Sequence, residues 1–202
     1  MKTTENYLAE IKEIRKMMEE SSRFLSLSGL SGILIGIYAL IGSYIAYRMI
    51  YNNAPSGMGG VVNKLVAIAF IVMVLSFITV LWLTNRRVKK TGRKIWNPGS
   101  KLMFINLAIP LISGGLLILI FTFRGVYDLI SPACLVFYGL ALVNAAKFTR
   151  QEIFFMGILQ VALGIVAALI PSVALLMWAA GFGVIHIFYG ALMYFRYEHK
   201  TN

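Results

Sequence analysis

The chain has 202 residues, of which 59% are hydrophobic and 13% are charged. A soluble domain carries about a quarter charged residues, so this composition excludes an ordinary water-exposed surface. The formal net charge of +11 is compatible with nucleic acid or anionic lipid as a partner. Because the cations lie between long apolar runs, membrane orientation is the better explanation, and we expect no nucleic-acid partner.

Residues 1–23 predict an amphipathic helix ahead of the first apolar run. Tyr7, Ile11, Ile14 and Met18 fall on one helical face by their spacing. The segment carries as many acidic as basic residues, whereas a membrane-seeking helix is usually more basic. We therefore expect a cytoplasmic helix that packs on the rest of the protein or on another copy.

Six apolar runs follow, and each is long enough to cross a hydrocarbon core of about 30 Å as a helix. They cover residues 24–47, 66–83, 102–123, 129–146, 153–170 and 173–195. The predicted fold is an all-α integral membrane domain over residues 24–196, with six transmembrane helices arranged as three antiparallel hairpins. A polar tail, 197–202, ends the chain.

The placement of lysine and arginine predicts that both termini are cytoplasmic. In that orientation the outer side holds only Arg48, Lys64 and Arg124, and all other lysines and arginines lie inside. Cytoplasmic loops of membrane proteins have this excess, so we expect a multi-pass protein of the bacterial inner (plasma) membrane. The basic segment after the second span either only sets this topology or also contacts anionic lipid headgroups. Its residues are Arg86, Arg87, Lys89, Lys90, Arg93 and Lys94.

The first span is rich in small residues and contains a GxxxG pair, Gly32 and Gly36. Glycine lets another helix approach closely where lipid provides no hydrophobic driving force. The pair therefore predicts a helix–helix contact, and a homo-oligomer formed through it is one possibility. The motif does not identify the partner helix.

Short strings recur between the spans. Phe137-Tyr138-Gly139 in the fourth span matches Phe188-Tyr189-Gly190 in the sixth, and a repeated two-helix unit is the economical interpretation. The last hairpin resembles the short hairpin repeat of the HdeD-type acid-resistance membrane proteins. That resemblance implies a six-helix inner-membrane protein with a role in acid stress. It is carried by Gly157-Ile158-Leu159, Gly164-Ile165, Ala167, Pro171, Ala174-Leu175-Leu176, Gly183 and Gly190.

The candidate polar site centres on His186, which lies near the middle of the sixth span. Gln160 lies at a similar depth in the antiparallel fifth span, and a Gln160–His186 hydrogen bond would satisfy two groups that lipid cannot. Tyr189 is one helical turn away, and Tyr38 lies close if the first span packs there. The site is either a structural pair that joins two helices or a pH-sensitive switch, since histidine changes charge near neutral pH.

The sequence does not indicate catalysis. No acidic residue lies deep in a span, there is no HExxH motif, phosphate loop or carboxylate dyad, and one cysteine, Cys134, supports neither a disulfide nor a zinc cluster. We expect no enzyme activity, metal or cofactor. The leading hypothesis is a membrane protein that senses or regulates membrane or acid stress, and the alternative is a small transporter or channel built from hairpin repeats.

Overall fold

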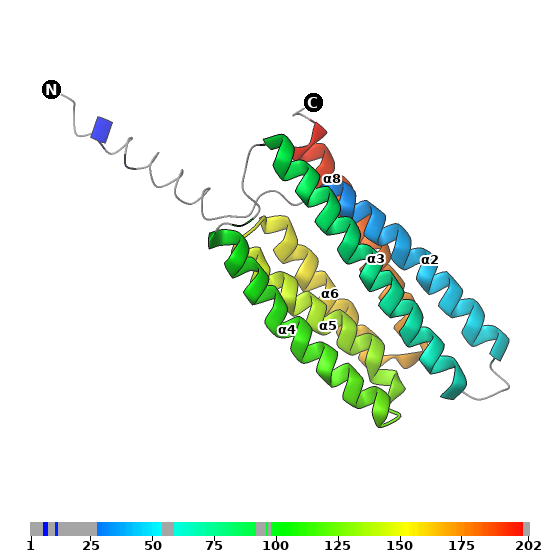
Figure 1. The fold of residues 1–202 in the computed structure, drawn as a ribbon. Helices are drawn as coiled ribbons and strands as arrows, with labels where there is room; N and C mark the ends of the chain where they lie inside the picture. Colours follow the sequence, from blue (N-terminus) through cyan, green and yellow to red (C-terminus); the bar gives the residue numbers. More distant parts are fainter. Residues whose placement is uncertain are drawn as a thin grey trace.

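The computed structural model describes residues 6–7, 11, 28–53, 59–91, 96 and 98–199 (Figure 1). The regular structure in these ranges is entirely helical, and six helices are long and apolar enough to cross a membrane. This confirms the predicted fold class. The predicted amphipathic helix of residues 1–23 lies outside the described residues except for Asn6, Tyr7 and Ile11.

The helices begin and end close to the predicted apolar runs, although the second is much longer than its run. The last span differs most from expectation, because it is not one regular α-helix but contains a π-helical segment, η4. The elements are α2 (Gly29–Asn53), α3 (Gly59–Thr91), α4 (Pro98–Phe123), η2 (Tyr127–Leu129), α5 (Ile130–Ala146), α6 (Gln151–Leu169), η3 (Pro171–Val173), α7 (Ala174–Trp178), η4 (Ala179–Ile185) and α8 (His186–Tyr197).

The helices form two groups that lie side by side (Figure 1). In one group α5 lies between α4 and α6, and in the other α2 lies between α3 and the last span. The last span joins the groups, because α7 packs against α6 and α5 whereas η4 and α8 pack mainly against α2. The closest packing therefore does not follow the three predicted hairpins: α5 with α6 and α2 with α8 cross the hairpin boundaries.

Glycines create the contact between α2 and α8. A Cβ atom at Gly32 would lie 2.9 Å from the Cα of Gly190, and one at Gly190 would lie 2.6 Å from the backbone nitrogen of Ile33. A Cβ at Gly36 would likewise lie 2.5 Å from the carbonyl oxygen of Gly183. Both residues of the GxxxG pair thus face the last span of the same chain. The pair therefore makes the predicted helix–helix contact within the chain, and the possibility of a homo-oligomer through Gly32 and Gly36 stays a prediction.

The α5–α6 contact uses glycine in the same way. A Cβ at Gly139 would lie 2.6 Å from the carbonyl oxygen of Gly157, and one at Gly157 would lie 2.7 Å from the carbonyl oxygen of Gly139. The two backbones therefore touch where these residues cross. Such close approach replaces hydrophobic burial as the source of helix association in lipid, so these glycines position the side chains of α5 and α6.

In contrast, α3 is held loosely. Residues 63–82 of this helix include no buried residue, and its packing partner among the described helices is α2. Large apolar side chains such as Phe70, Phe77 and Trp82 are exposed around it. In a membrane these side chains face lipid, so α3 depends on α2 and on contacts at its ends for its position.

Candidate functional site

Four residues near the middle of the bundle form a polar centre: Tyr138, Gln160, Gly181 and His186. The Gln160 amide Nε2 donates to the carbonyl oxygen of Gly181 over 2.8 Å, and Nδ1 of His186 lies 3.0 Å from the same oxygen. Nε2 of His186 lies 2.8 Å from the hydroxyl of Tyr138. Gln160 and His186 are both buried. The carbonyl oxygen of Gly181 thus contacts side chains from α6 and the last span, and the imidazole of His186 links this network to Tyr138 on α5.

The hydrogen-bond pattern defines the tautomer of His186. A carbonyl oxygen only accepts, so Nδ1 must carry a hydrogen and donate to Gly181. In the neutral imidazole Nε2 then accepts the hydrogen bond from the Tyr138 hydroxyl. Every ring nitrogen is satisfied in this state. The polar centre is therefore built for a neutral histidine with its hydrogen on Nδ1.

The polar centre coincides with an irregularity of the backbone. Gly181 lies inside the π-helical segment and His186 follows its end. A Cβ at Gly181 would clash with Oε1 of Gln160 and would lie 2.5 Å from Cδ2 of Leu135, so glycine is needed for the glutamine amide to reach the backbone. π-Helical turns often mark functional positions in helices. Here the segment lies where the last span changes its neighbours from α5 and α6 to α2.

Aromatic rings enclose the imidazole. Phe182 lies 5.9 Å from His186 between ring centroids at an interplanar angle of 17°, and Tyr138 lies 5.4 Å away at 25°. Trp178 continues the row against Phe182 at 4.9 Å. Burial among these rings disfavours a charge on the imidazole, which agrees with the neutral state that the hydrogen bonds define.

One atom of the polar centre has no partner among the described residues. Oε1 of Gln160 accepts no hydrogen bond from them, and the residue is 0% exposed. An unpaired buried acceptor usually costs about 1–3 kcal/mol. The polar centre therefore retains one unused acceptor beside the π-helical segment.

The structure brings together only part of the predicted site. Gln160 and His186 meet at the carbonyl of Gly181 instead of bonding directly to each other. Tyr189 is half-buried and packs edge-on against Phe188, and the hydroxyl of Tyr38 accepts a 3.4 Å hydrogen bond from Thr79 on α3.

Sequence reasoning missed Tyr138, which occupies the place that we assigned to Tyr189. The repeated Phe-Tyr-Gly string was the available signal, since Tyr138 precedes Gly139 as Tyr189 precedes Gly190. It also missed Gly181, whose role depends on a backbone carbonyl. Apolar patterning carries no information about which carbonyl a side chain reaches.

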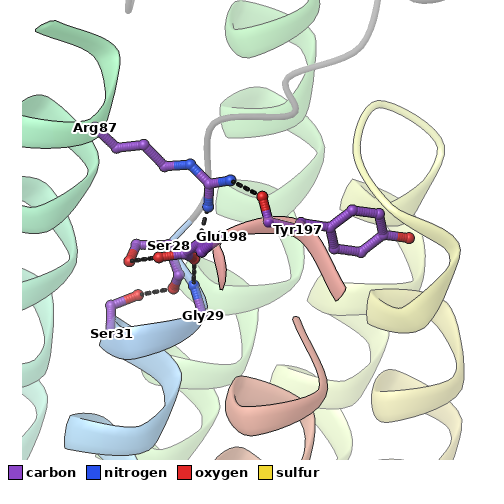
Figure 2. Close-up of polar contacts among 6 residues, drawn as sticks. All are labelled: Ser28, Gly29, Ser31, Arg87, Tyr197 and Glu198. Atoms are coloured by element: carbon purple, nitrogen blue, oxygen red, sulfur yellow. Dashed lines mark hydrogen bonds and ion pairs between the residues drawn. The ribbon is translucent and has the colours of Figure 1, made fainter. Parts of the chain in front are cut away.

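A second polar group lies where the last span ends, and we call it the terminal clamp: Ser28, Gly29, Arg87 and Glu198 (Figure 2). The Glu198 carboxylate accepts hydrogen bonds from the backbone N–H of Gly29 and, over 3.2 Å, from the hydroxyl of Ser28. Nη1 of Arg87 lies 2.6 Å from the same carboxylate. A carboxylate at a helix N-terminus satisfies unpaired N–H groups and the helix dipole, so Glu198 caps α2 while it pairs with α3.

The neighbouring Tyr197 points to the other helix group, as Figure 2 shows. Its hydroxyl donates to Oε1 of Glu152 over 2.7 Å, and the guanidinium carbon of Arg150 lies 3.5 Å from its ring centroid. Arg196 pairs with the same glutamate at 3.0 Å. Partial burial lowers the pKa of the Arg150 guanidinium, while Tyr197 and Glu152 act in the opposite direction.

The basic residues predicted to contact lipid differ in their surroundings. Arg86 is exposed with its guanidinium 5.8 Å from the Trp82 ring, and Lys89 is exposed. Arg87 instead turns toward Glu198 and the carbonyl oxygen of Tyr197. Arg93, Lys94 and the side chain of Lys90 lie outside the described residues.

No protein-family model matches the chain, and neither a curated protein nor a solved structure is significantly similar to it. Among the described residues, no three His, Cys, Asp or Glu side chains are grouped as metal ligands would be. The fold and its helix lengths define a multi-span membrane protein. Any more specific function has to be argued from the polar centre and the terminal clamp.

Proposed function

We propose that this is a non-enzymatic protein of the bacterial inner membrane that responds to acid through protonation of His186. The observation that carries the proposal is the hydrogen-bond network of the polar centre, in which Tyr138, Gln160 and His186 from three spans meet around one carbonyl of a π-helical segment. The HdeD-type resemblance of the last hairpin supports the same physiological setting.

Protonation would reverse the role of one atom. In the neutral state Nε2 of His186 accepts from Tyr138, whereas an imidazolium donates from both ring nitrogens. The Tyr138 hydroxyl would then accept from Nε2–H and turn its own hydrogen to another acceptor, and we propose that this change rearranges the contact between α5 and the last span. Among the described residues, Tyr138 is a titratable side chain in contact with His186, whereas Gln160 on α6 carries no titratable group.

The rearrangement would occur at η4, where a shift can be passed from one helix group to the other. Because the last span changes neighbours at η4, a shift there changes how the two helix groups are joined. Protonation of buried histidines is an established way to bias such two-state elements. The proposed output is a displacement of the last span relative to α6.

The test measures that displacement in the full chain in lipid nanodiscs. Spin labels are placed at exposed Phe155 on α6 and Phe195 on α8 after Cys134→Ala removes the native thiol. We expect the distance distribution to shift on acidification, and His186→Gln to abolish the shift. His199→Gln is the control, because it changes the other histidine of the chain. An unchanged distribution in the wild type, or a full shift in His186→Gln, would overturn the proposal.

Flux measurements separate this proposal from the transport alternative. In liposomes, a sensor leaves the proton permeability equal to that of empty vesicles at neutral and acidic pH. If the protein instead conducts protons or small anions and His186→Gln stops the flux, the transporter hypothesis replaces the sensor.

Single-cysteine labelling tests the proposed orientation, in which both termini are cytoplasmic. Reagents that cannot enter cells should label Arg124→Cys but not Asn85→Cys, and the reverse result would contradict this orientation.

We also propose that exposed Arg86 and Lys89 contact anionic lipid. Both lie near the end of α3 on the same side as the proposed cytoplasmic termini, and each near-surface cation contributes about 1 kcal/mol of attraction to such lipids. Cross-linking to a photoactivatable phosphatidylglycerol should fall in the Arg86→Gln/Lys89→Gln double variant. Unchanged cross-linking would contradict the lipid contact.

A further inference from the structure

Two consecutive residues at the end of the last span reach in opposite directions. Tyr197 contacts Glu152 and Arg150 at the start of α6, whereas Glu198 contacts Gly29 at the start of α2 and Arg87 near the end of α3. These contacts connect the two helix groups at one end of the bundle. Because Tyr197 and Glu198 are adjacent in the chain, the contacts with both helix groups depend on the position of the last turn of α8.

The clamp matters most for α3. Along the membrane this helix packs against α2, and its residues 63–82 are exposed or at most half-buried. Arg87 adds a link to the last span through two contacts, 2.6 Å to the Glu198 carboxylate and 3.3 Å to the carbonyl oxygen of Tyr197. The side chains of Arg87 and Glu198 are only 18% and 17% exposed, so the pair is partly removed from water and is less screened than a surface ion pair.

Within the terminal clamp, Glu198 is the residue that joins α2 and α3 to the end of α8. Its carboxylate holds the N–H of Gly29, the hydroxyl of Ser28 and the guanidinium of Arg87 (Figure 2). Ser28 is itself fixed, since its carbonyl oxygen accepts a 2.6 Å hydrogen bond from Ser31. Because Glu198 lies one residue beyond α8, an axial shift or rotation of α8 would carry the carboxylate away from both α2 and α3.

We propose that the terminal clamp is a conformational latch, closed in this structure, whose release frees α3 from the last span. The latch differs from the polar centre in its chemistry, because it depends on the charge of Glu198, whereas the polar centre depends on the protonation of His186. When the carboxylate is lost, α3 retains its contact with α2 and the weaker 3.3 Å hydrogen bond from Arg87 to the carbonyl oxygen of Tyr197, so this end is held less firmly. Its end should then occupy a wider range of distances from α6.

The test again uses the full chain in nanodiscs, with spin labels at exposed Asn85 on α3 and exposed Gln151 on α6 in the Cys134→Ala background. Glu198→Gln keeps the size of the side chain but removes its charge, and Arg87→Gln removes the partner. Both are expected to add a longer and broader component to the distance distribution at neutral pH. Arg86→Gln, next to Arg87 but directed to Trp82, is the matched control and should reproduce the wild type.

Circular dichroism verifies that each variant keeps its helices. Glu198→Asp retains the charge on a shorter side chain and should change the distance distribution less than Glu198→Gln does. This pair of Glu198 variants tests the latch even if the Arg87 variant does not fold. A static ion pair would lower stability and leave the distances unchanged. Unaltered distributions in both Glu198 variants would therefore overturn the latch, whereas the pH-dependent response of Phe155 and Phe195 labels tests the polar centre independently.

Discussion

The polar centre and the terminal clamp both involve the last span, one near its middle and one just beyond its end, but they use opposite chemistry. The polar centre consists of neutral groups, buried and surrounded by aromatic rings. The terminal clamp is charged and lies at a helix end, with an arginine, a glutamate and a helix N-terminus. Charge deep in a bilayer is costly, whereas at its boundary water and headgroups reduce the cost.

The polar centre and the terminal clamp illustrate two ways in which the helices of this protein are held together. Near the middle of the membrane, glycines bring backbones into contact and the few polar side chains bond to a carbonyl or to one another. At the end, the backbones of α2 and α8 still touch at Gly29, and the charged side chains of Arg87 and Glu198 add a link to α3. The middle therefore depends on shape, and the end depends on shape and charge together. Four substitutions or conditions test that distinction, and their expected effects decrease in the order given.

The largest effect is expected from Gly181→Leu. The added side chain meets Gln160 and Leu135, which pack against this glycine, and overpacking typically costs about 1–3 kcal/mol. Together with loss of the Gln160 hydrogen bond, we expect the free energy of unfolding to fall by about 3 kcal/mol. Gly115→Leu is the control, because nothing lies within 4 Å of a Cβ at that position. Equal losses in both variants, measured by steric trapping in bicelles, would contradict the packing argument.

Glu198→Gln should have the next largest effect and should depend on salt. Loss of charge-assisted hydrogen bonds typically costs about 1.5 kcal/mol, and we expect this loss at low ionic strength. At 1 M salt the Debye length is about 3 Å, so the difference from wild type should shrink. Unfolding measured at both salt concentrations checks this, with Gly181→Leu as the salt-independent reference. A loss that salt does not change would contradict the electrostatic origin of the clamp.

Tyr138→Phe should cost about 1 kcal/mol in the free energy of unfolding. The change removes the hydroxyl that donates to Nε2 of His186 and leaves that nitrogen without its partner. Tyr189→Phe, at the equivalent place of the repeated string, is the control and should cost less. The result would be contradicted if Tyr189→Phe were the more damaging of the two.

Gln160→Leu should have the smallest effect, about 0.5 kcal/mol or less. Gly181 keeps its hydrogen bond from His186, and the substitution also removes the unpaired Oε1. Leucine is apolar and of similar volume, so no large cavity forms. An unfolding free energy lowered by more than 2 kcal/mol would mean that Oε1 has a partner in solution, such as a buried water.

The six spans were predictable because long apolar runs have few structural solutions in a bilayer. The spatial order of the helices was not, since glycines such as Gly32 and Gly157 indicate close contacts without naming the partner. The same limit left the partner of Gly32 and Gly36 open between a second copy and a helix of the same chain, and in the structure they face the last span.

Within the site, His186 and Gln160 stood out as polar residues in apolar spans, and their depths matched. The π-helical segment did not stand out, because its residues read as an ordinary apolar helix. Its geometry depends on the carbonyl of Gly181, the imidazole and the glutamine amide acting together. The terminal clamp was also missed, since Glu198 and Arg87 are more than a hundred residues apart in sequence and only the packing of α2 against α8 brings them together.

The central claim is that His186 is neutral, donates from Nδ1, and takes up a proton when the last span shifts. Nitrogen-15 NMR of histidine-labelled protein in nanodiscs tests it directly, because the chain has two histidines and His199→Gln assigns the remaining signal to His186. We predict the Nδ1–H tautomer at neutral pH and a doubly protonated ring at the acidic pH where the Phe155–Phe195 distance changes. A ring that stays neutral while that distance changes, or one that carries its hydrogen on Nε2, would contradict the account.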